Sequence, residues 1–219
     1  MAEILPGVHL VEHLTDSPDF STDVYLVKDQ GPTWTLIDTG LPGKAPVLEA
    51  YLKAHEIAPG SIRKILITHL HLDHVGNLRR MAELTHARTY AHWIDAAYIA
   101  GQPPYKGPGV PPQEHLKIDE PFKDGDTIDA GGGLVVYHTP GHTPGHSSFY
   151  QPQRKILFAG DLIFGKFTLT PKEYTLDLPT AQISARRVSK LPLESVLTYH
   201  GGSYLKQPGA LFHKLVESF

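Results

Sequence analysis

The stretch KILITHLHLDHVGN, residues 64–77, constrains this chain more than any other. An apolar run typical of a buried strand passes directly into three histidines and an aspartate within six positions, at His69, His71, Asp73 and His74. Uncompensated burial of several such groups would cost several kcal/mol, so packing alone does not account for them. Neutral imidazole and carboxylate are ligands that zinc and similar divalent ions take. The stretch therefore predicts a metal site at the end of a strand.

Three further apolar runs end in the same way. LVVYHTPG precedes His142, KILFAG precedes Asp161 and SVLTY precedes His200. Because sheets bring strand ends to a common edge, these residues are expected to converge on the cluster in residues 69–74. In an extended segment the first two histidines of that cluster point the same way, while its last two ligands fall where the chain turns into a helix. One short loop could then supply ligands to two adjacent metals.

The segment YHTPGHTPGHSS offers His138, His142 and His146, and their spacing alone does not choose among them. The middle histidine lies in a Pro-Gly turn, where its side chain is free to point at the sheet edge. The outer two are expected within or beside strands. The remaining histidines outside the motifs are interpreted as ordinary surface or core residues: His9, His13, His55, His86, His92, His115 and His213.

Composition narrows the class of protein. The 219 residues contain no cysteine, which excludes disulfides and thiolate metal sites. A formal charge of -3, with acids and bases interspersed, gives no broad basic face for nucleic acid. No run approaches the roughly 20 apolar residues of a membrane span, and the N-terminus does not read as a secretory signal. One cytoplasmic domain over residues 1–219 is expected, without membrane or nucleic-acid partners.

The order of predicted elements indicates two sheets packed on each other with helices outside. The segments are a hairpin in 21–40, a helix in 45–57, a strand in 64–68, helices in 75–84 and 92–100, a Pro-rich loop in 101–115, strands between 125 and 160, and then helix 180–191, strand 195–199 and helix 208–219.

THLHLDHVG, TPGHTPGHSS, FAGD and TYHGG, in this order, resemble the metallo-β-lactamase superfamily, and LIDTG at Asp38 is a further match. The resemblance implies an α+β fold, a four-layer αββα sandwich with a dinuclear metal site at one edge. Carried over by position, it assigns to the first metal His69, His71 and His142, and to the second Asp73, His74 and His200. Asp161 would bridge them, and Asp38 would orient a ligand imidazole or its loop. Two Zn²⁺ per chain are expected, with iron or manganese as alternatives.

The resemblance is to the glyoxalase II and lactonase branches. The chain departs from glyoxalase II in reading GDLIFGKFTLTPKEY after the bridging aspartate, without the basic Gly-Arg stretch of that branch. The expected activity is hydrolysis, by a hydroxide held between two metals, of an ester-type bond in a small molecule: a lactone, thioester or phosphoester. Asp73 or Asp161 would steer the proton. The alternative is a mononuclear iron oxidoreductase similar to persulfide dioxygenases.

Two expectations concern the substrate. Three tyrosines, Tyr105, Tyr174 and Tyr199, are candidates to donate a hydrogen bond to the oxyanion. The Pro-rich loop in 101–115, together with IFGKFTLTPKEY, lines an apolar substrate pocket in one interpretation and is a rigid surface connection in the other. The natural substrate and the oligomeric state do not follow from the sequence.

Overall fold

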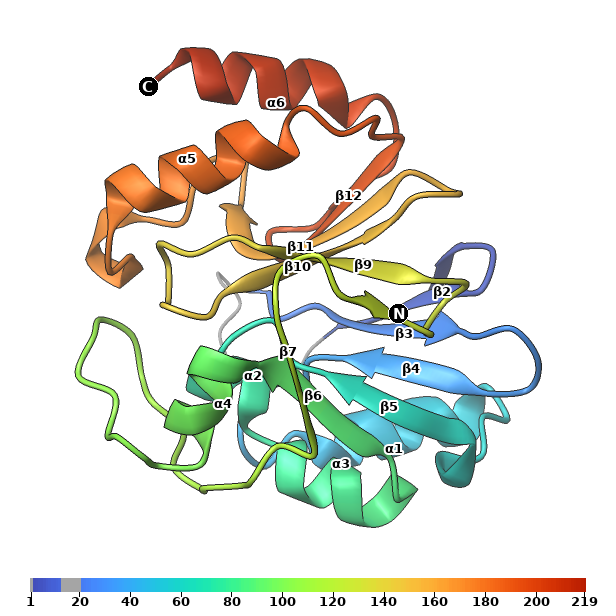
Figure 1. The fold of residues 1–219 in the computed structure, drawn as a ribbon. Coiled ribbons are helices and arrows are strands. Elements are labelled where there is room, and N and C mark those ends of the chain that lie inside the picture. The colour runs from blue at the N-terminus through green and yellow to red at the C-terminus, as the bar shows by residue number, and fades with distance from the viewer. Residues whose placement is uncertain (1, 13–20) are drawn as a thin grey trace.

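Two β-sheets lie face to face between two layers of helices, as Figure 1 shows. The structure is a computed structural model that describes residues 2–12 and 21–219, so that His13 lies outside the described residues. The four layers confirm the expected α+β sandwich. The extent of a single domain over residues 1–219 stays a prediction.

The first sheet has seven strands in chain order. Its members are β1 (Ala2–Leu5), β2 (Val8–Val11), β3 (Val24–Lys28), β4 (Trp34–Ile37), β5 (Ile62–Leu66), β6 (Arg88–His92) and β7 (Glu120–Phe122). Pairing is antiparallel from β1 to β4 and parallel from β4 to β7. The parallel half places the ends of β4, β5 and β6 at one edge.

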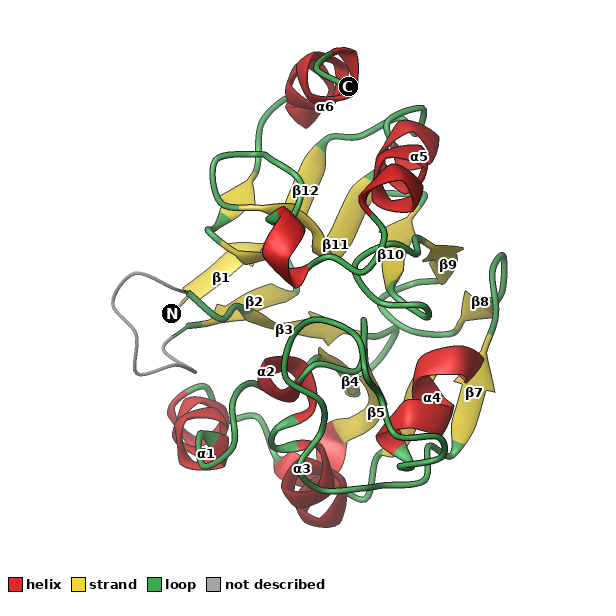
Figure 2. Cartoon of the chain, turned by 90° about the vertical axis from the view of Figure 1, so that its left-hand side faces the viewer, coloured by secondary structure: helices red, strands yellow, loops and turns green. Residues whose placement is uncertain are grey.

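The second sheet has six strands in the order β13-β12-β11-β10-β9-β8. They are β8 (Thr127–Ile128), β9 (Leu134–His138), β10 (Ser147–Gln151), β11 (Ile156–Phe164), β12 (Ser195–His200) and β13 (Ser203–Tyr204). Only β11 and β12 run parallel, and both reach the same edge of the sandwich as β5. Figure 2 looks onto this edge, where α2 and the loop after α4 lie.

Helices cover the outer face of each sheet (Figure 1). The first layer consists of α1 (Ala45–Ala54), α2 (Leu72–Val75), α3 (Leu78–Thr85) and α4 (Trp93–Ile99); the second consists of α5 (Leu178–Val188) and α6 (Pro208–Glu217). Two short 3₁₀ turns are η1 (Pro59–Ser61) and η2 (Lys172–Tyr174). Within the described residues no helix is both long enough and apolar enough to cross a membrane.

Alternation along the strands builds separate cores. In β3, Leu26 packs toward α1 and α3, whereas its neighbours Tyr25 and Val27 face the second sheet. Successive side chains of a strand point to opposite faces, so each strand supplies both the helix-facing and the inter-sheet core. Phe149 and Phe158 meet the first sheet from the other side. Because the strands are buried on both faces, the two sheets are fixed against each other and their strand ends lie at one edge.

The predicted elements are present with several corrections. The helix predicted in 75–84 is α3, which begins three residues later, and residues 72–75 form the separate helix α2. Between the two helices the Asn77 side chain bonds Thr39 O, Leu41 O and the amide of Ala45. The strand predicted to end before Asp161 continues through it. Strands β1, β2, β6, β7 and β13 were not predicted, because they are short or lack clear alternation.

Candidate metal centre

All seven side chains predicted as ligands meet at the strand-end edge. The segment after β5 carries His69 and His71, and α2 carries Asp73 and His74. The β9–β10 turn brings His142, while β11 and β12 bring Asp161 and His200. Three groups of these residues have donor atoms within 4.8 Å of one another: His69, His71 and His142; His69, His74 and Asp161; and Asp73, His74 and His200.

The first group is an arrangement of three buried imidazoles. The Nε2 atom of His69 lies 3.0 Å from Nδ1 of His71 and 3.0 Å from Nε2 of His142. Three ring nitrogens thus face one point from three directions. This is the geometry in which imidazoles share one cation.

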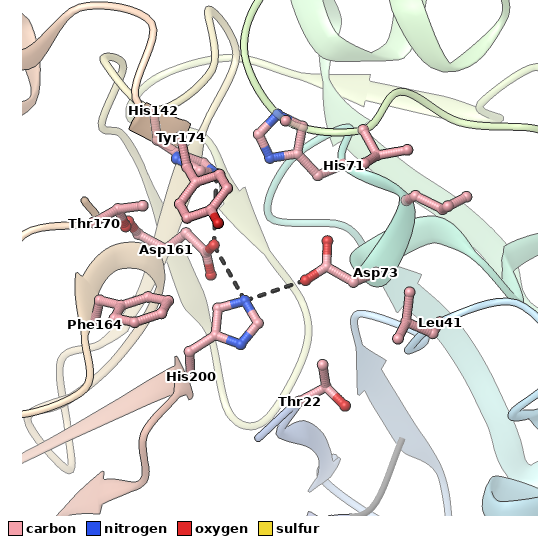
Figure 3. A pocket seen from close by; sticks show the side chains of 13 residues that line it. Thr22, Leu41, His71, Asp73, His142, Asp161, Phe164, Thr170, Tyr174 and His200 are labelled. Carbon is pink, nitrogen blue, oxygen red and sulfur yellow. Dashed lines mark hydrogen bonds and ion pairs between the residues drawn. The ribbon is translucent and has the colours of Figure 1, made fainter. Parts of the chain in front are cut away.

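The second group stands beside the first, and one carboxylate lies between them (Figure 3). Nε2 of His200 is 3.1 Å from Asp73 Oδ2, and Nε2 of His74 is 3.7 Å from the same oxygen. The Asp161 carboxylate has Oδ1 at 3.4 Å from His74 Nε2 and Oδ2 at 3.4 and 3.5 Å from Nε2 of His200 and His142. Asp161 therefore contacts both groups.

The outer ring nitrogens of His71, His74 and His200 face acceptors, whereas Nδ1 of His142 is buried without a hydrogen-bond partner among the described residues. Nε2 of His71 lies 3.0 Å from Pro108 O, and Nδ1 of His74 lies 3.0 Å from Asp38 Oδ2. Nδ1 of His200 faces Ser21 O. Because carbonyl and carboxylate oxygens only accept, each of these three outer nitrogens carries a proton, and with an ion bound the inner nitrogen of each neutral ring would offer it a lone pair.

These donors fit a divalent cation. His74 Nε2 and Asp161 Oδ1 lie 3.4 Å apart, and among the described residues both atoms are buried without a hydrogen bond of good geometry. Buried polar atoms without a partner are costly, and a positive ion between them removes that cost. Nitrogen and oxygen donors in this mixture suit zinc, iron or manganese.

The pKa values show how the ion-free site balances its charges. Burial and the neighbouring imidazoles hold the pKa of His69 and of His142 well below the usual range. Burial would also lower the pKa of His74, but Asp161, Asp73 and Asp38 outweigh it and raise that pKa to about 10. Asp161 and Asp73 likewise outweigh burial and raise the pKa of His200. Protons on these two imidazoles offset the carboxylates where an ion would otherwise do so.

Asp38 lies against the ligand loop, as expected. Its Oδ1 accepts the Thr68 amide at 2.8 Å, and its Oδ2 accepts the Thr68 hydroxyl at 2.8 Å in addition to contacting His74. The aspartate has φ +61, which places its carboxylate under the end of β5. Asp38 thus orients one imidazole and the start of the loop that bears the cluster.

Comparisons with known proteins identify the family of this site. The sequence pattern of the metallo-beta-lactamase superfamily matches residues 17–207. The chain belongs to this superfamily. Members bind metals, and the histidine and aspartate groups here are the residues that could hold one.

Relatives of this superfamily member include hydrolases. An uncharacterized protein, YobT, of Bacillus subtilis is 34% identical over 152 residues, covering 65% of this chain and 62% of its own. Two proteins named hydroxyacylglutathione hydrolase, from Hyphomonas neptunium and Pseudomonas aeruginosa, are 31% and 34% identical and cover 79% and 56% of this chain. The alignments span 59% and 41% of their own lengths. The chain thus matches well under two thirds of each of these two hydrolases.

Solved structures share the fold. A metallo-beta-lactamase family protein of Thermus thermophilus superposes with a TM-score of 0.75 at 24% identity, covering 99% of this chain and 79% of that one. A metallo-beta-lactamase of Cronobacter sakazakii gives 0.78 at 23% identity, covering 98% and 89%. At this level of identity the likeness establishes the fold alone.

The three histidines of the β9–β10 region have different surroundings. His142 is the one that reaches His69. His146 is buried behind the cluster and accepts the Asp161 amide at Nε2, 3.0 Å away. His138 stacks on His92 with ring centroids 4.0 Å apart. This placement agrees with the choice of His142.

Asp95 is a positioning residue that the sequence did not reveal. Its buried carboxylate accepts the Leu70 amide at 3.0 Å, the Thr143 hydroxyl at 2.7 Å and the Gly145 amide at 2.6 Å. Leu70 separates two ligand histidines and Thr143 follows a third, so one carboxylate on α4 joins both loops. Gly145 permits this approach, since a Cβ there would lie 2.5 Å from Asp95 Oδ1. A helical aspartate without a neighbouring motif gives no sequence signal for such a role.

A pocket opens above the cluster, with a cavity volume of about 270 Å³. Asp73, Asp161 and His200 form part of its floor (Figure 3). The Pro-rich loop contributes Gly109 and Val110, and the segment after β11 contributes Thr170 and Tyr174. Both segments named from the sequence therefore line one pocket.

Replacing Asp95 with alanine should weaken both the fold and the metal site. Three buried donors would lose their acceptor, at about 1–3 kcal/mol each. We expect a loss of at least about 3 kcal/mol in the free energy of unfolding and a roughly 10- to 100-fold loss in zinc affinity. Denaturant unfolding and competitive chelator titration measure these quantities.

Asp119→Ala is the matched control, because Asp119 accepts the amide and hydroxyl of Thr89 at the start of β6, both at 2.9 Å. It should lower stability and leave zinc affinity unchanged. Equal zinc affinity in Asp95→Ala and Asp119→Ala would contradict the positioning role.

Zinc binding should release protons. Below a pKa of about 10 the ion-free His74 is protonated, and an ion must displace that proton. The apparent affinity should therefore rise with pH between about 6 and 9, by about tenfold per unit for each proton released. Calorimetry in buffers of different ionisation enthalpy counts the protons; a count of zero near neutral pH would contradict this charge balance.

Proposed function

We propose that this chain is a metal-dependent hydrolase that holds two zinc ions and cleaves an ester-type bond in a small molecule: a lactone, thioester or phosphoester. One observation carries the proposal, namely two complete donor groups that share Asp161 on the floor of a pocket. The relatives named hydroxyacylglutathione hydrolase support an ester-type reaction. A pocket of this volume suits a small-molecule partner.

Each residue has a proposed part in holding the ions. The first ion would bind His69, His71 and His142, and the second would bind Asp73, His74 and His200, with Asp161 reaching both. Zinc ions held by these residues would supply an activated water and would polarise the scissile bond. Iron and manganese accept the same donors, so metal analysis decides the identity.

Two carboxylates are positioned to move the proton. Asp73 borders the pocket with 24% of its side chain exposed, whereas Asp161 is 6% exposed and contacts both groups. We assign Asp73 the transfer of a proton to the leaving oxygen or sulfur, since it has access to a bound substrate. Asp161 orients the attacking water from below.

Tyr174 is the proposed donor to the developing oxyanion. It is 46% exposed, lines the pocket, and its hydroxyl points into the pocket above Asp161 in Figure 3. The other two candidates are placed differently: the Tyr199 hydroxyl donates to Asp73 O behind the cluster, and Tyr105 packs edge-on against His71 with ring centroids 5.9 Å apart. These two support the ligands.

A mononuclear iron oxidoreductase would need only the three histidines of the first group. The second group is equally complete, and its imidazoles are oriented by Asp38 and Ser21. This second set of oriented donors favours the two-metal hydrolase.

Protein purified without added metal should carry two zinc ions per chain, and His71→Ala should lose the metal of the first group together with hydrolysis. A cluster ligand contributes directly to metal affinity and therefore to the activated water, so we expect kcat/KM to fall by about 1000-fold or more. Elemental analysis and a panel of lactones, thioesters and phosphoesters measure both.

His213→Ala is the control, because its side chain is 73% exposed on α6 and should change neither quantity. One iron per chain with oxygen uptake would overturn the hydrolase in favour of the oxidoreductase. Full hydrolysis by His71→Ala would also overturn it.

Tyr174→Phe should lower kcat by about 10²-fold and leave the zinc content unchanged, because one preorganised oxyanion donor is removed. Tyr137→Phe is the matched control: its ring packs against Arg187 on the outer face, 5.0 Å from the guanidinium. Equal kcat values for the two variants would contradict the role of Tyr174 as the oxyanion donor.

A further inference from the structure

The pocket points to one class of substrate. We propose that it selects esters or lactones whose non-reacting part is an uncharged apolar chain, in preference to thioesters or phosphoesters with an anionic non-reacting part. This proposal takes the hydrolytic reaction from the proposed function, whereas the selectivity is argued from the residues of the pocket walls.

Apolar side chains form the walls on both sides of the cluster. Leu41 lies on the Asp73 side of the pocket, and Phe164 lies on the opposite side beside His200 (Figure 3). Leu72, which precedes Asp73, and Val110, whose carbonyl accepts the Leu72 amide, also line the pocket. The ring of Tyr174 extends the Phe164 side. A substrate whose reacting bond lies at the floor would therefore place its remaining atoms between apolar surfaces.

Besides the metal-site residues at the floor, the polar side chains of the lining carry three neutral hydroxyls, those of Thr22, Thr170 and Tyr174, and Thr22 Oγ1 has no hydrogen-bond partner among the described residues. The metal-site residues form the floor, and the Thr170 hydroxyl donates to Asp161 O. No lysine or arginine is among the described residues that line the pocket, and residues 13–20 contain none in their sequence. A carboxylate or phosphate held between the walls, away from the floor, would lose water without gaining a cationic side chain as partner, which is unfavourable.

The apolar wall is built onto the ligand loop. The amide of Leu72 donates to Val110 O at 2.9 Å, and Pro108 O accepts from His71. Gly109 lies so close that a Cβ would come within 2.3 Å of His71 Nε2. The wall therefore starts directly beside the reacting centre, where the first carbons of a chain would lie.

Binding tests the pocket without hydrolysis. The probes are n-alkyl hydroxamates of increasing length, which bind zinc through the hydroxamate group, added to the zinc-loaded protein. Each methylene transferred to the apolar walls should strengthen binding about fourfold until the chain fills the cavity. A hydroxamate of equal length that ends in a carboxylate should bind about tenfold more weakly or worse. Affinity independent of chain length, or equal for the charged probe, would overturn the proposal.

Substitution at the rim tests the same wall. Val110 is 56% exposed in a loop, so both Val110→Lys and its control Val110→Leu are compatible with the fold. The leucine variant should keep the dependence on chain length. The lysine variant should weaken binding of the alkyl probe and strengthen binding of the carboxylate probe, so that the preference falls about tenfold or more. An unchanged preference in Val110→Lys would overturn the assignment of this wall.

Measurements of hydrolysis distinguish a failure of the proposed hydrolase from a failure of the proposed pocket selectivity. For matched lactones and thiol esters, kcat/KM should follow the same order as hydroxamate binding. If probes bind in the expected order and no ester is cleaved, the hydrolase fails and the apolar pocket stands. If S-lactoylglutathione, whose glutathione part is anionic, is cleaved at least as fast as an alkyl thioester, the hydrolase stands and the selectivity fails.

Discussion

Seven imidazole and carboxylate groups meet at one edge of the sandwich, and the loss of their hydration opposes folding. Most of the surrounding structure offsets this cost. Asp38, Pro108 and Ser21 supply acceptors to the outer ring nitrogens of His74, His71 and His200, so that these three rings are oriented before any ion arrives. Such preorganisation matters because buried charges and lone pairs stabilise a site only when every partner is in place. The inner atoms left without partners, on His74 and Asp161, are where a cation completes the set.

The two sheets make this convergence possible. Ligands from residues 69–74 and from residues 142–200 are far apart in sequence, and the inter-sheet core brings the ends of β5, β11 and β12 to one edge. Asp95 then joins the two halves locally, since it binds backbone on both sides. The site is therefore a property of the whole sandwich, although a six-residue segment supplies four of its donors.

The sequence predicted which segments converge at the edge, because strand ends and donor residue types leave a local signal. His69 and Asp161 each follow an apolar run that is visible without a structure. What it could not predict depends on contacts between distant segments. The break between α2 and α3 follows from the bonds of Asn77 to residues 39–45, and the role of Asp95 follows from two loops meeting at α4. Among three candidate histidines, spacing alone left the choice open, and only the fold shows that the His142 ring nitrogen lies beside that of His69.

The substrate wall and the metal site share one loop, which limits how each can vary. Pro108 O orients His71, the next residue packs on its ring, and Val110 then lines the pocket. A change of backbone in residues 108–110 would therefore move a ligand imidazole together with the wall. Side-chain changes at Val110 leave that hydrogen bond in place, since only the main chain of Pro108 takes part in it. Selectivity is thus free to vary at the exposed side chain, while the backbone beneath it is held by the requirements of the metal site.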